Sequence, residues 1–190
     1  MRGGRISAMA EAGKPAAVKL LCGMISARVE LFDAALEALA GRFGPVDVLS
    51  ETMPFDFTHY YDLQMGSPLY RRFAGFERLI DPAALVEAKL ATNAIEAEFA
   101  ARGGGQPARP INLDPGYVES SKLVLASMKN FSHRIYLARG VYGEVTLMYH
   151  KGRWDGLAWT FPDFASARYH PFLSSVRQRL MDSQRKERSA

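Results

Sequence analysis

The stretch that decides the fold is Val18–Ser26, with the sequence VKLLCGMIS. Lys19 is its single charged residue, and the run has the length of a strand. A continuous apolar run of this kind is typical of a strand that is covered on both faces. It predicts a buried central strand, in which Cys22 is a small buried hydrophobe rather than a nucleophile.

Outward from this strand, the pattern first becomes helical. Apolar residues recur every three or four positions over residues 28–43, which predicts an amphipathic helix that ends at Gly44-Pro45. Alternation of apolar and polar residues then predicts a strand at Thr58–Met65. Leu69–Ile80 is interpreted as a returning strand, with a short helix as the alternative.

A second helix and a short strand follow. Asp81-Pro82 combines a favoured N-cap residue with proline at the first helical position, and the helix is expected to run to Gly103–Gly105. Ile111–Leu113 is the next predicted strand. Three polar residues on one face of this helix are interpreted as solvated: Lys89, Asn93 and Glu96.

The order strand, helix, strand, strand, helix, strand predicts the α+β class. The expected arrangement is a ferredoxin-like βαββαβ layer over about residues 18–114, with an antiparallel sheet and both helices on one face. We expect a single α+β domain at residues 15–180, between a flexible tail at residues 1–14 and a basic tail at residues 181–190.

The second half of the chain extends this layer by a helix, a β-hairpin and a C-terminal helix. Ser120 and Ser121 predict the start of a helix that continues to about Asn130. The C-terminal helix is expected to bury one face through residues at helical spacing, namely Tyr169, Phe172, Val176 and Leu180.

The hairpin is predicted to turn through a three-residue loop, Ala138–Gly140, in which glycine takes the left-handed position. The expected pairs are Leu137 with Val141, Ile135 with Gly143, and Arg134 with Glu144. One face is then apolar, with Ile135, Leu137, Val141, Val145 and Leu147, and the other is polar. The polar face is either a salt-bridged exterior or the floor of a site.

Composition excludes several classes of protein. The 190 residues are 48% hydrophobic and 23% charged, which are ordinary values for a soluble globular chain. No apolar stretch approaches the ~20 residues that span a bilayer, and a single cysteine without a secretory signal predicts a cytoplasmic protein. The chain lacks the G-x-x-x-x-G-K-[ST] string of a P-loop GTPase. Its one cysteine and four scattered histidines predict no metal site.

Several motifs occur together along the chain. The longer ones are Asn112–Tyr117 (NLDPGY), Lys122–Ser127 (KLVLAS), His133–Leu137 (HRIYL) and Glu144–Leu147 (EVTL). Shorter pieces are Tyr60-Tyr61 with Met65-Gly66, Lys89 with Thr92-Asn93 and Glu96, and Trp159–Asp163 (WTFPD). As a set, they resemble the bacterial family called domain of unknown function 4416, over roughly residues 15–180. Gln64 and Met128 depart from the family's pattern, and the resemblance implies no particular reaction.

Cationic residues are concentrated in one segment of the chain. Residues 109–153 contain Arg109, Lys122, Lys129, Arg134, Arg139, Lys151 and Arg153, against only Asp114, Glu119 and Glu144. The whole chain carries a formal charge of +4. A cationic segment within a nearly neutral body suggests an anionic ligand.

Two hypotheses of different classes follow, and both leave the cofactor and the oligomeric state open. The first is a protein that binds or acts on a phosphorylated small molecule or nucleotide. Its phosphate would be held by Lys122, Lys129 and Arg134 and by amides at the Ser120/Ser121 helix start, with Glu144, Asp114 and His133 as candidate catalytic groups. The second is a non-enzymatic module that binds RNA or a protein through the same surface and the aromatic stretch Trp154–Phe164.

Overall fold

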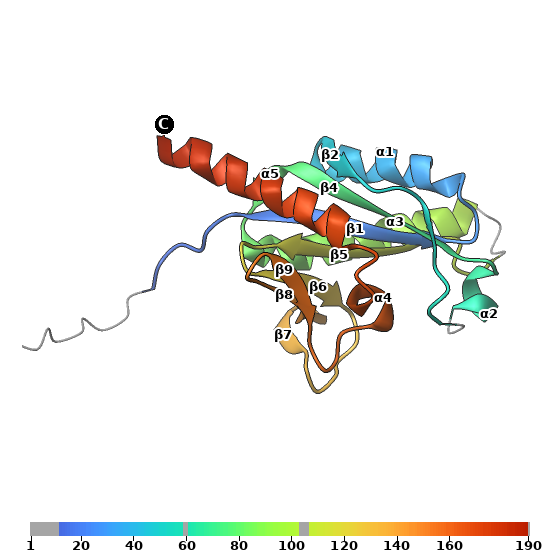
Figure 1. Ribbon diagram of the computed structural model, residues 1–190. Helices are drawn as coiled ribbons and strands as arrows, with labels where there is room; N and C mark the ends of the chain where they lie inside the picture. The colour runs from blue at the N-terminus through green and yellow to red at the C-terminus, as the bar shows by residue number, and fades with distance from the viewer. Residues whose placement is uncertain (1–11, 59–60, 103–106, 190) are drawn as a thin grey trace, which may run out of the picture.

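The computed structural model describes residues 12–58, 61–102 and 107–189, and its centre is a nine-stranded antiparallel sheet (Figure 1). Helices cover both faces of this sheet, which confirms the predicted α+β class. Across the described residues, no helix combines the length and the apolarity that crossing a bilayer requires.

Strands and helices alternate in the first half of the chain, and strands dominate the second. The strands are β1 (Val18–Ser26), β2 (Val46–Leu49), β3 (Met53–Pro54), β4 (Tyr70–Ile80), β5 (Asn112–Val118), β6 (Lys122–Ser127), β7 (Ile135–Ala138), β8 (Val141–His150) and β9 (Arg153–Gly156). The helices are α1 (Leu31–Phe43), α2 (Asp62–Met65), α3 (Leu85–Arg102), α4 (Pro162–Ala165) and α5 (His170–Ser189), and the 3-10 turn η1 (Pro82–Ala84) leads into α3.

β1 lies inside the sheet, whose strand order is β2-β4-β1-β5-β6-β8-β7, with β3 beside β4 and β9 beside β8. It pairs with β4 on one side and β5 on the other, and all nine of its residues are buried. The predicted buried central strand is therefore confirmed. The ammonium group of Lys19 donates to Asp47 and to the carbonyl of Phe76, both at 2.7 Å, so the one charge in the strand is paired.

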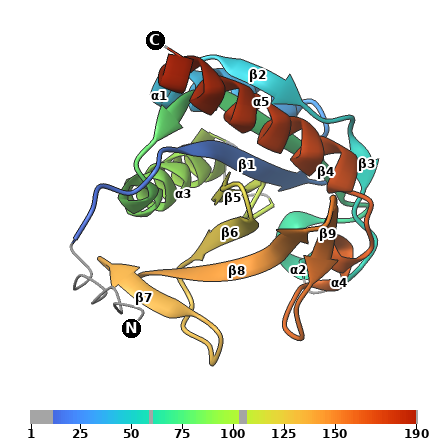
Figure 2. The ribbon, with the colours of Figure 1, turned by 60° about the vertical axis from the view of Figure 1, so that its left-hand side comes forward.

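The two faces of β1 contribute to two separate cores. Leu20, Cys22 and Met24 pack toward α1 and α3, whereas Leu21 packs with residues of α5. Figure 2 shows α5 lying along the sheet. Cys22 is fully buried, as predicted, and this burial raises the pKa of its thiol.

Three predicted helices and one predicted strand are confirmed. α1 and α3 occupy the expected segments, and the Asp81 carboxylate accepts from the Ala83 amide at 2.8 Å as the expected cap. β4 confirms the strand interpretation of Leu69–Ile80. The four residues predicted for the inner face of the C-terminal helix are all buried, Tyr169 just before α5 and the other three on it, and α5 continues to Ser189, so residues 181–189 extend this helix.

Two predicted elements are wrong. The strand expected at Thr58–Met65 is in part the helix α2, with residues 59–60 outside the described part of the chain. Tyr61 and Met65, which are four positions apart as on a helix face, pack in one small core, whereas Leu63 between them is wholly exposed. The helix expected from Ser120/Ser121 to Asn130 is instead β6 and the turn after it. The apolar run Leu123–Ala126 is buried on both faces, which suits a strand next to β5.

Candidate functional site

The β7–β8 hairpin positions the candidate site. Its loop has two residues, Arg139-Gly140, both at positive φ, which is the geometry that suits a tight hairpin turn. The predicted three-residue loop, and with it the pairing of Leu137 with Val141, is wrong. The pairing of Ile135 with Gly143 is confirmed, because a register shift between β7 and β8 at Leu137 takes up the extra residue.

A second register shift, between β6 and β8, decides the orientation of Glu144. Glu144 lies opposite Leu125, and Leu147 lies opposite Leu123, so both side chains point to the face that α5 covers. Val145 packs on the α3 side of the sheet, so the predicted grouping of Val145 with Leu147 on one face is wrong. Glu144 is consequently buried rather than part of a solvated exterior.

Glu144 binds two side chains from the segment just before β7, the guanidinium of Arg134 and the imidazole of His133. Its Oε2 accepts from Nε of Arg134 at 2.7 Å and lies 3.1 Å from Nε2 of His133. Its Oε1 accepts from the Thr146 hydroxyl at 3.3 Å. Nη1 of Arg134 also donates to the carbonyl of Lys129, at 3.0 Å. The side chain of Glu144 is only 2% exposed, against 11% for Arg134 and 12% for His133.

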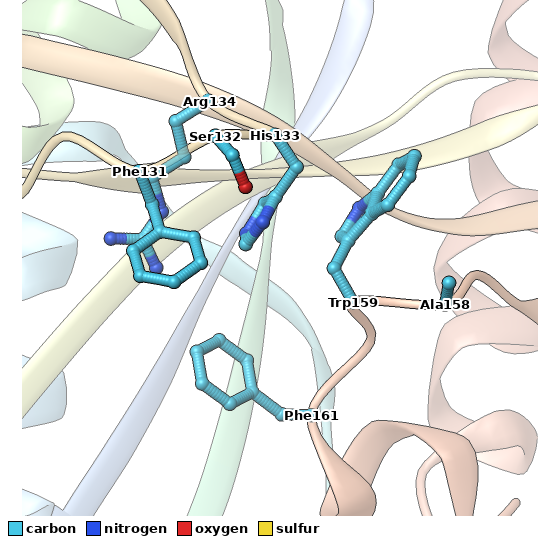
Figure 3. A pocket seen from close by; sticks show the side chains of 7 residues that line it. All are labelled: Phe131, Ser132, His133, Arg134, Ala158, Trp159 and Phe161. Carbon is cyan, nitrogen blue, oxygen red and sulfur yellow. The ribbon is translucent and has the colours of Figure 1, made fainter.

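An aromatic hollow of about 460 Å³ opens beside this cluster (Figure 3). We use the term aromatic hollow for the space lined by Phe131, Ser132, His133, Arg134, Ala158, Trp159 and Phe161. The rings of His133 and Trp159 are stacked, with centroids 5.5 Å apart and planes 6° apart, and Phe131 lies 5.2 Å from His133. Phe131, Trp159 and Phe161 are 63%, 40% and 46% exposed, so their ring surfaces are open to a ligand.

The segment that carries Trp159 and Phe161 is fixed to the sheet. The Trp159 indole donates to the carbonyl of Val145 at 2.8 Å, and the Thr160 hydroxyl donates to the carbonyl of Thr146 at 2.6 Å. Both acceptors lie at the irregular part of β8, where its register against β6 shifts. The side of the aromatic hollow formed by Trp159 and Phe161 is thus hydrogen-bonded to β8, the strand that also carries Glu144.

Asp163, at the start of α4, pairs with the buried guanidinium of Arg71 from β4. Aromatic rings surround that guanidinium, those of Phe55, Phe73, Phe164 and Tyr169 all lying within 5.5 Å of it. Burial acts to lower the pKa of Arg71, but Asp163, Tyr169 and Asp114 together outweigh it and hold the pKa above its usual value. Burial has the opposite effect on the Tyr169 phenol, whose pKa it raises to about 12.

Asp114 belongs to this second cluster and does not line the aromatic hollow. Its carboxylate lies 3.7 Å from Arg71 and 3.7 Å from Lys89, and it accepts from the Asn112 amide at 2.6 Å. In the sheet, β6 separates its strand, β5, from β8. The sequence grouped Asp114 with Glu144, but each carboxylate has its own set of cations.

Neither predicted phosphate-binding lysine presents its ammonium group in the lining of the hollow. Lys122 is the first residue of β6, at the end of the strand away from Phe131, where it lies opposite Met148 and pairs with Glu119. Lys129 follows β6 and contributes its carbonyl to Arg134. The anion site expected at the Ser120/Ser121 helix start is wrong, because no helix begins there. Of the predicted site residues, the structure brings together Glu144, His133 and Arg134.

The helix face predicted to be solvated has another role. Lys89 is buried and donates to the carbonyl of Leu113 at 3.0 Å, and Glu96 accepts from the amide of Leu113 at 2.7 Å. β6 pairs with β5 only from Gly116 onward, so the two side chains occupy the place of a neighbouring strand. Burial raises the pKa of Glu96, although Arg109 beside it acts in the opposite direction.

The sequence identified the aromatic stretch Trp154–Phe164 but missed Phe131 as part of the same site. Phe131 and Phe161 are thirty positions apart and meet only through the packing of two loops (Figure 3). The sequence did contain one indication of this role, because Phe131 is a large aromatic residue in a polar turn next to His133-Arg134.

Comparison with known proteins identifies the family. The sequence profile of the family described as domain of unknown function (DUF4416) matches residues 16–180. The chain belongs to this family. No curated protein and no solved structure matches the chain.

The motifs that carry the DUF4416 resemblance meet at the two clusters described above. His133-Arg134, Glu144 and Trp159 come from three of these motifs and converge at the aromatic hollow. Lys89, Asn112, Asp114 and Asp163 come from three motifs and converge around Arg71 and the β5 edge. In this DUF4416 protein, many of the residues that carry the family resemblance therefore belong to the two polar clusters.

Proposed function

We propose that the aromatic hollow binds a nucleotide, whose base stacks on the exposed rings and whose phosphate meets Arg134. The observation that carries this proposal is the combination of exposed aromatic rings with an arginine, Arg134, that is held by the buried Glu144. Aromatic side chains stack on bases, and arginine forms bidentate contacts with phosphate. Both kinds of group lie on one hollow here.

The aromatic part of the hollow supports a planar ligand. Three of its large apolar side chains lie at the surface, where contiguous apolar area is typical of binding sites. The stack of His133 on Trp159 aligns two ring planes, and the bond from the indole to the Val145 carbonyl fixes that orientation. A base can extend this stack without rearrangement of the rings.

Arg134 supports the phosphate. Glu144 takes its Nε and the Lys129 carbonyl takes its Nη1, so the guanidinium is held in one orientation. A guanidinium has five N–H donors, and Arg134 lines the hollow, so its further donors can meet an oxyanion there. Fixing the guanidinium in advance lowers the entropy lost on binding.

Glu144 then acts by positioning. Both of its oxygen atoms are already hydrogen-bonded or ion-paired, and almost none of its surface is exposed. A general acid or base needs contact with the substrate, so we assign Glu144 to the orientation of Arg134 and His133. His133 is the titratable imidazole that lines the hollow and is the remaining candidate for proton transfer.

The alternative, an RNA-binding or protein-binding module that uses the cationic 109–153 surface, is less well supported. Most cations of that segment are neutralised by carboxylates of the same chain. The pairs are Arg109–Glu96, Lys122–Glu119, Arg134–Glu144, Arg139–Glu87 and Arg153–Asp155. Paired cations release few counterions on binding a polyanion, so the surface offers little polynucleotide affinity.

The test is a titration of the protein with adenosine monophosphate and with guanosine monophosphate. Tryptophan fluorescence is the readout of binding. The chain has two tryptophans, of which Trp159 is 40% and Trp154 only 4% exposed. We expect saturable quenching that persists in Trp154→Phe and disappears in Trp159→Phe. Phe161→Ala should weaken binding about tenfold or more, because stacking contributes about 1–3 kcal/mol per base.

Val29→Ala is the matched control, because Val29 has the same 46% exposure as Phe161 but lies before α1. It should leave the affinity unchanged. Adenosine without phosphate should bind more weakly than the monophosphate, and Arg134→Lys should reduce that difference. The proposal would be contradicted if neither nucleotide gave saturable quenching. Binding only of a single-stranded oligonucleotide, with a steep loss of affinity on adding salt, would favour the alternative.

We also infer that the first half of the chain forms a ferredoxin-like βαββαβ layer. The strand order β5-β1-β4-β2, with β5, β1, β4 and β2 all antiparallel to their neighbours, supports this inference. So does the common core that α1 and α3 share on one face of these strands. β6 to β9 and α5 would then be additions that carry the aromatic hollow and cover the second face.

A further inference from the structure

The charged groups at the aromatic hollow limit how many phosphates of a nucleotide it can bind. Among the residues that line it, all in the described part of the chain, Arg134 alone carries a permanent charge, and none is an aspartate or a glutamate. The rest of the lining consists of four apolar or aromatic side chains together with Ser132 and His133. The hollow therefore offers one strong phosphate-binding group.

The charge of this group is largely offset inside the protein. Oε2 of Glu144 lies 2.7 Å from Nε of Arg134, and the side chain of Glu144 is almost completely buried. A carboxylate at this distance lowers the positive potential that the guanidinium presents to a ligand, because the two opposite charges largely cancel at longer range. Arg134 consequently acts as a directed hydrogen-bond donor to one phosphate group rather than as a source of attraction for several.

A second or third phosphate would meet no further cation in the lining. It would lie against the aromatic side chains at the surface, such as Phe131 and Phe161, or extend into solvent. A charged group that loses water against apolar surface without a partner costs free energy, and one that stays in water gains none. Additional phosphates should therefore leave the affinity unchanged or lower it.

We propose that the aromatic hollow recognises a nucleotide through a single phosphate, so that its ligand class is the nucleoside monophosphate. This inference rests on the function proposed above and specifies the ligand of the same site. Figure 3 shows Arg134 and Trp159 on opposite sides of His133, an arrangement that suits a stacked base with its first phosphate at the arginine. Stacking on the rings then supplies most of the affinity.

The test compares adenosine mono-, di- and triphosphate in the Trp154→Phe protein, in which Trp159 is the remaining tryptophan and its quenching reports binding. We expect the di- and triphosphate to bind no more than about threefold more tightly than the monophosphate. Ala158→Lys adds a second cation to the lining. It should make the triphosphate bind about tenfold or more tighter than the monophosphate, because a second phosphate then has a partner.

Val29→Lys is the matched control, because it adds the same charge at an exposed position before α1 and should leave all three affinities unchanged. Far-ultraviolet circular dichroism checks that each variant is folded. If the unaltered hollow bound the triphosphate more than about threefold tighter than the monophosphate, nucleotide binding would stand and this inference would be overturned. An Ala158→Lys protein without a preference for the triphosphate would also overturn it, because the number of lining cations would then not set the number of phosphates bound. If none of the three nucleotides bound, the proposed function itself would fail, and this inference with it.

Discussion

Single residues in this protein show how buried charge is tolerated when each charge has defined partners. Glu144 is neutralised by Arg134, and Lys19 is neutralised by Asp47. The sequence predicted that Arg134 and Glu144 are neighbours, because a tight turn and alternation are local features. It did not predict the burial of Glu144, or that a register shift against β6 puts Glu144 on the same face as Leu147.

The substitution Glu144→Gln tests that burial. It removes the negative charge while Arg134 stays largely buried, and breaking a buried ion pair by loss of one partner costs about 3–5 kcal/mol. We expect the free energy of unfolding in urea to fall by about 3 kcal/mol. Glu98→Gln removes the exposed pair with Arg102 and should change it by less than about 1 kcal/mol. Equal effects of the two substitutions would refute the buried character of the Glu144 cluster.

At the scale of elements, α3 completes the edge of β5 where β6 does not reach. Lys89 and Glu96, seven positions apart on the helix, bind the carbonyl and the amide of Leu113. Spacing alone predicted that they share a face, which is correct. Their burial could not be predicted, because it depends on a strand edge that only the assembled sheet defines.

Lys89→Met should therefore destabilise the protein although it makes the helix face more apolar. It leaves the Leu113 carbonyl without its donor and removes a cation near Asp114, and an unsatisfied buried group costs about 1–3 kcal/mol. Urea unfolding measures the loss. Lys122→Met is the matched control, because Lys122 is partly exposed and pairs with the partly exposed Glu119, and it should change stability by less than about 1 kcal/mol. An unchanged Lys89→Met protein would show that the β5 edge needs no cap.

The element that the sequence misassigned was β6. Its apolar core, Leu123–Ala126, is four residues long, a length at which helix and strand patterns cannot be distinguished. The serines before it resemble a helix cap, yet the segment pairs with β5 and β8 on its two sides. Tertiary pairing thus overrides a local capping signal, and the predicted lysine face disappears with the helix.

For the whole molecule, the two-sided burial of β1 determines how the layers assemble. Its alternating side chains require a cover on each face, which α1 and α3 provide on one side and α5 on the other. The spacing of apolar residues predicted all three helices. The aromatic hollow could not be predicted, since Phe131 and Phe161 lie in separate loops, one before β7 and one after β9, that only the assembled sheet brings to one hollow.

The core beneath α5 connects distant parts of the chain, with Leu21, Leu147 and Trp154 packed against Leu173. Leu173→Ala should lower the free energy of unfolding by about 2–5 kcal/mol, since Leu173 is fully buried. Because this core joins β1 to β8 and β9, Trp154 fluorescence and far-ultraviolet circular dichroism should shift together in urea. Leu63→Ala, at a fully exposed position, should shift neither. A fluorescence shift without a dichroism shift would mean that β6 to β9 unfold separately from the first half, contrary to a single cooperative domain.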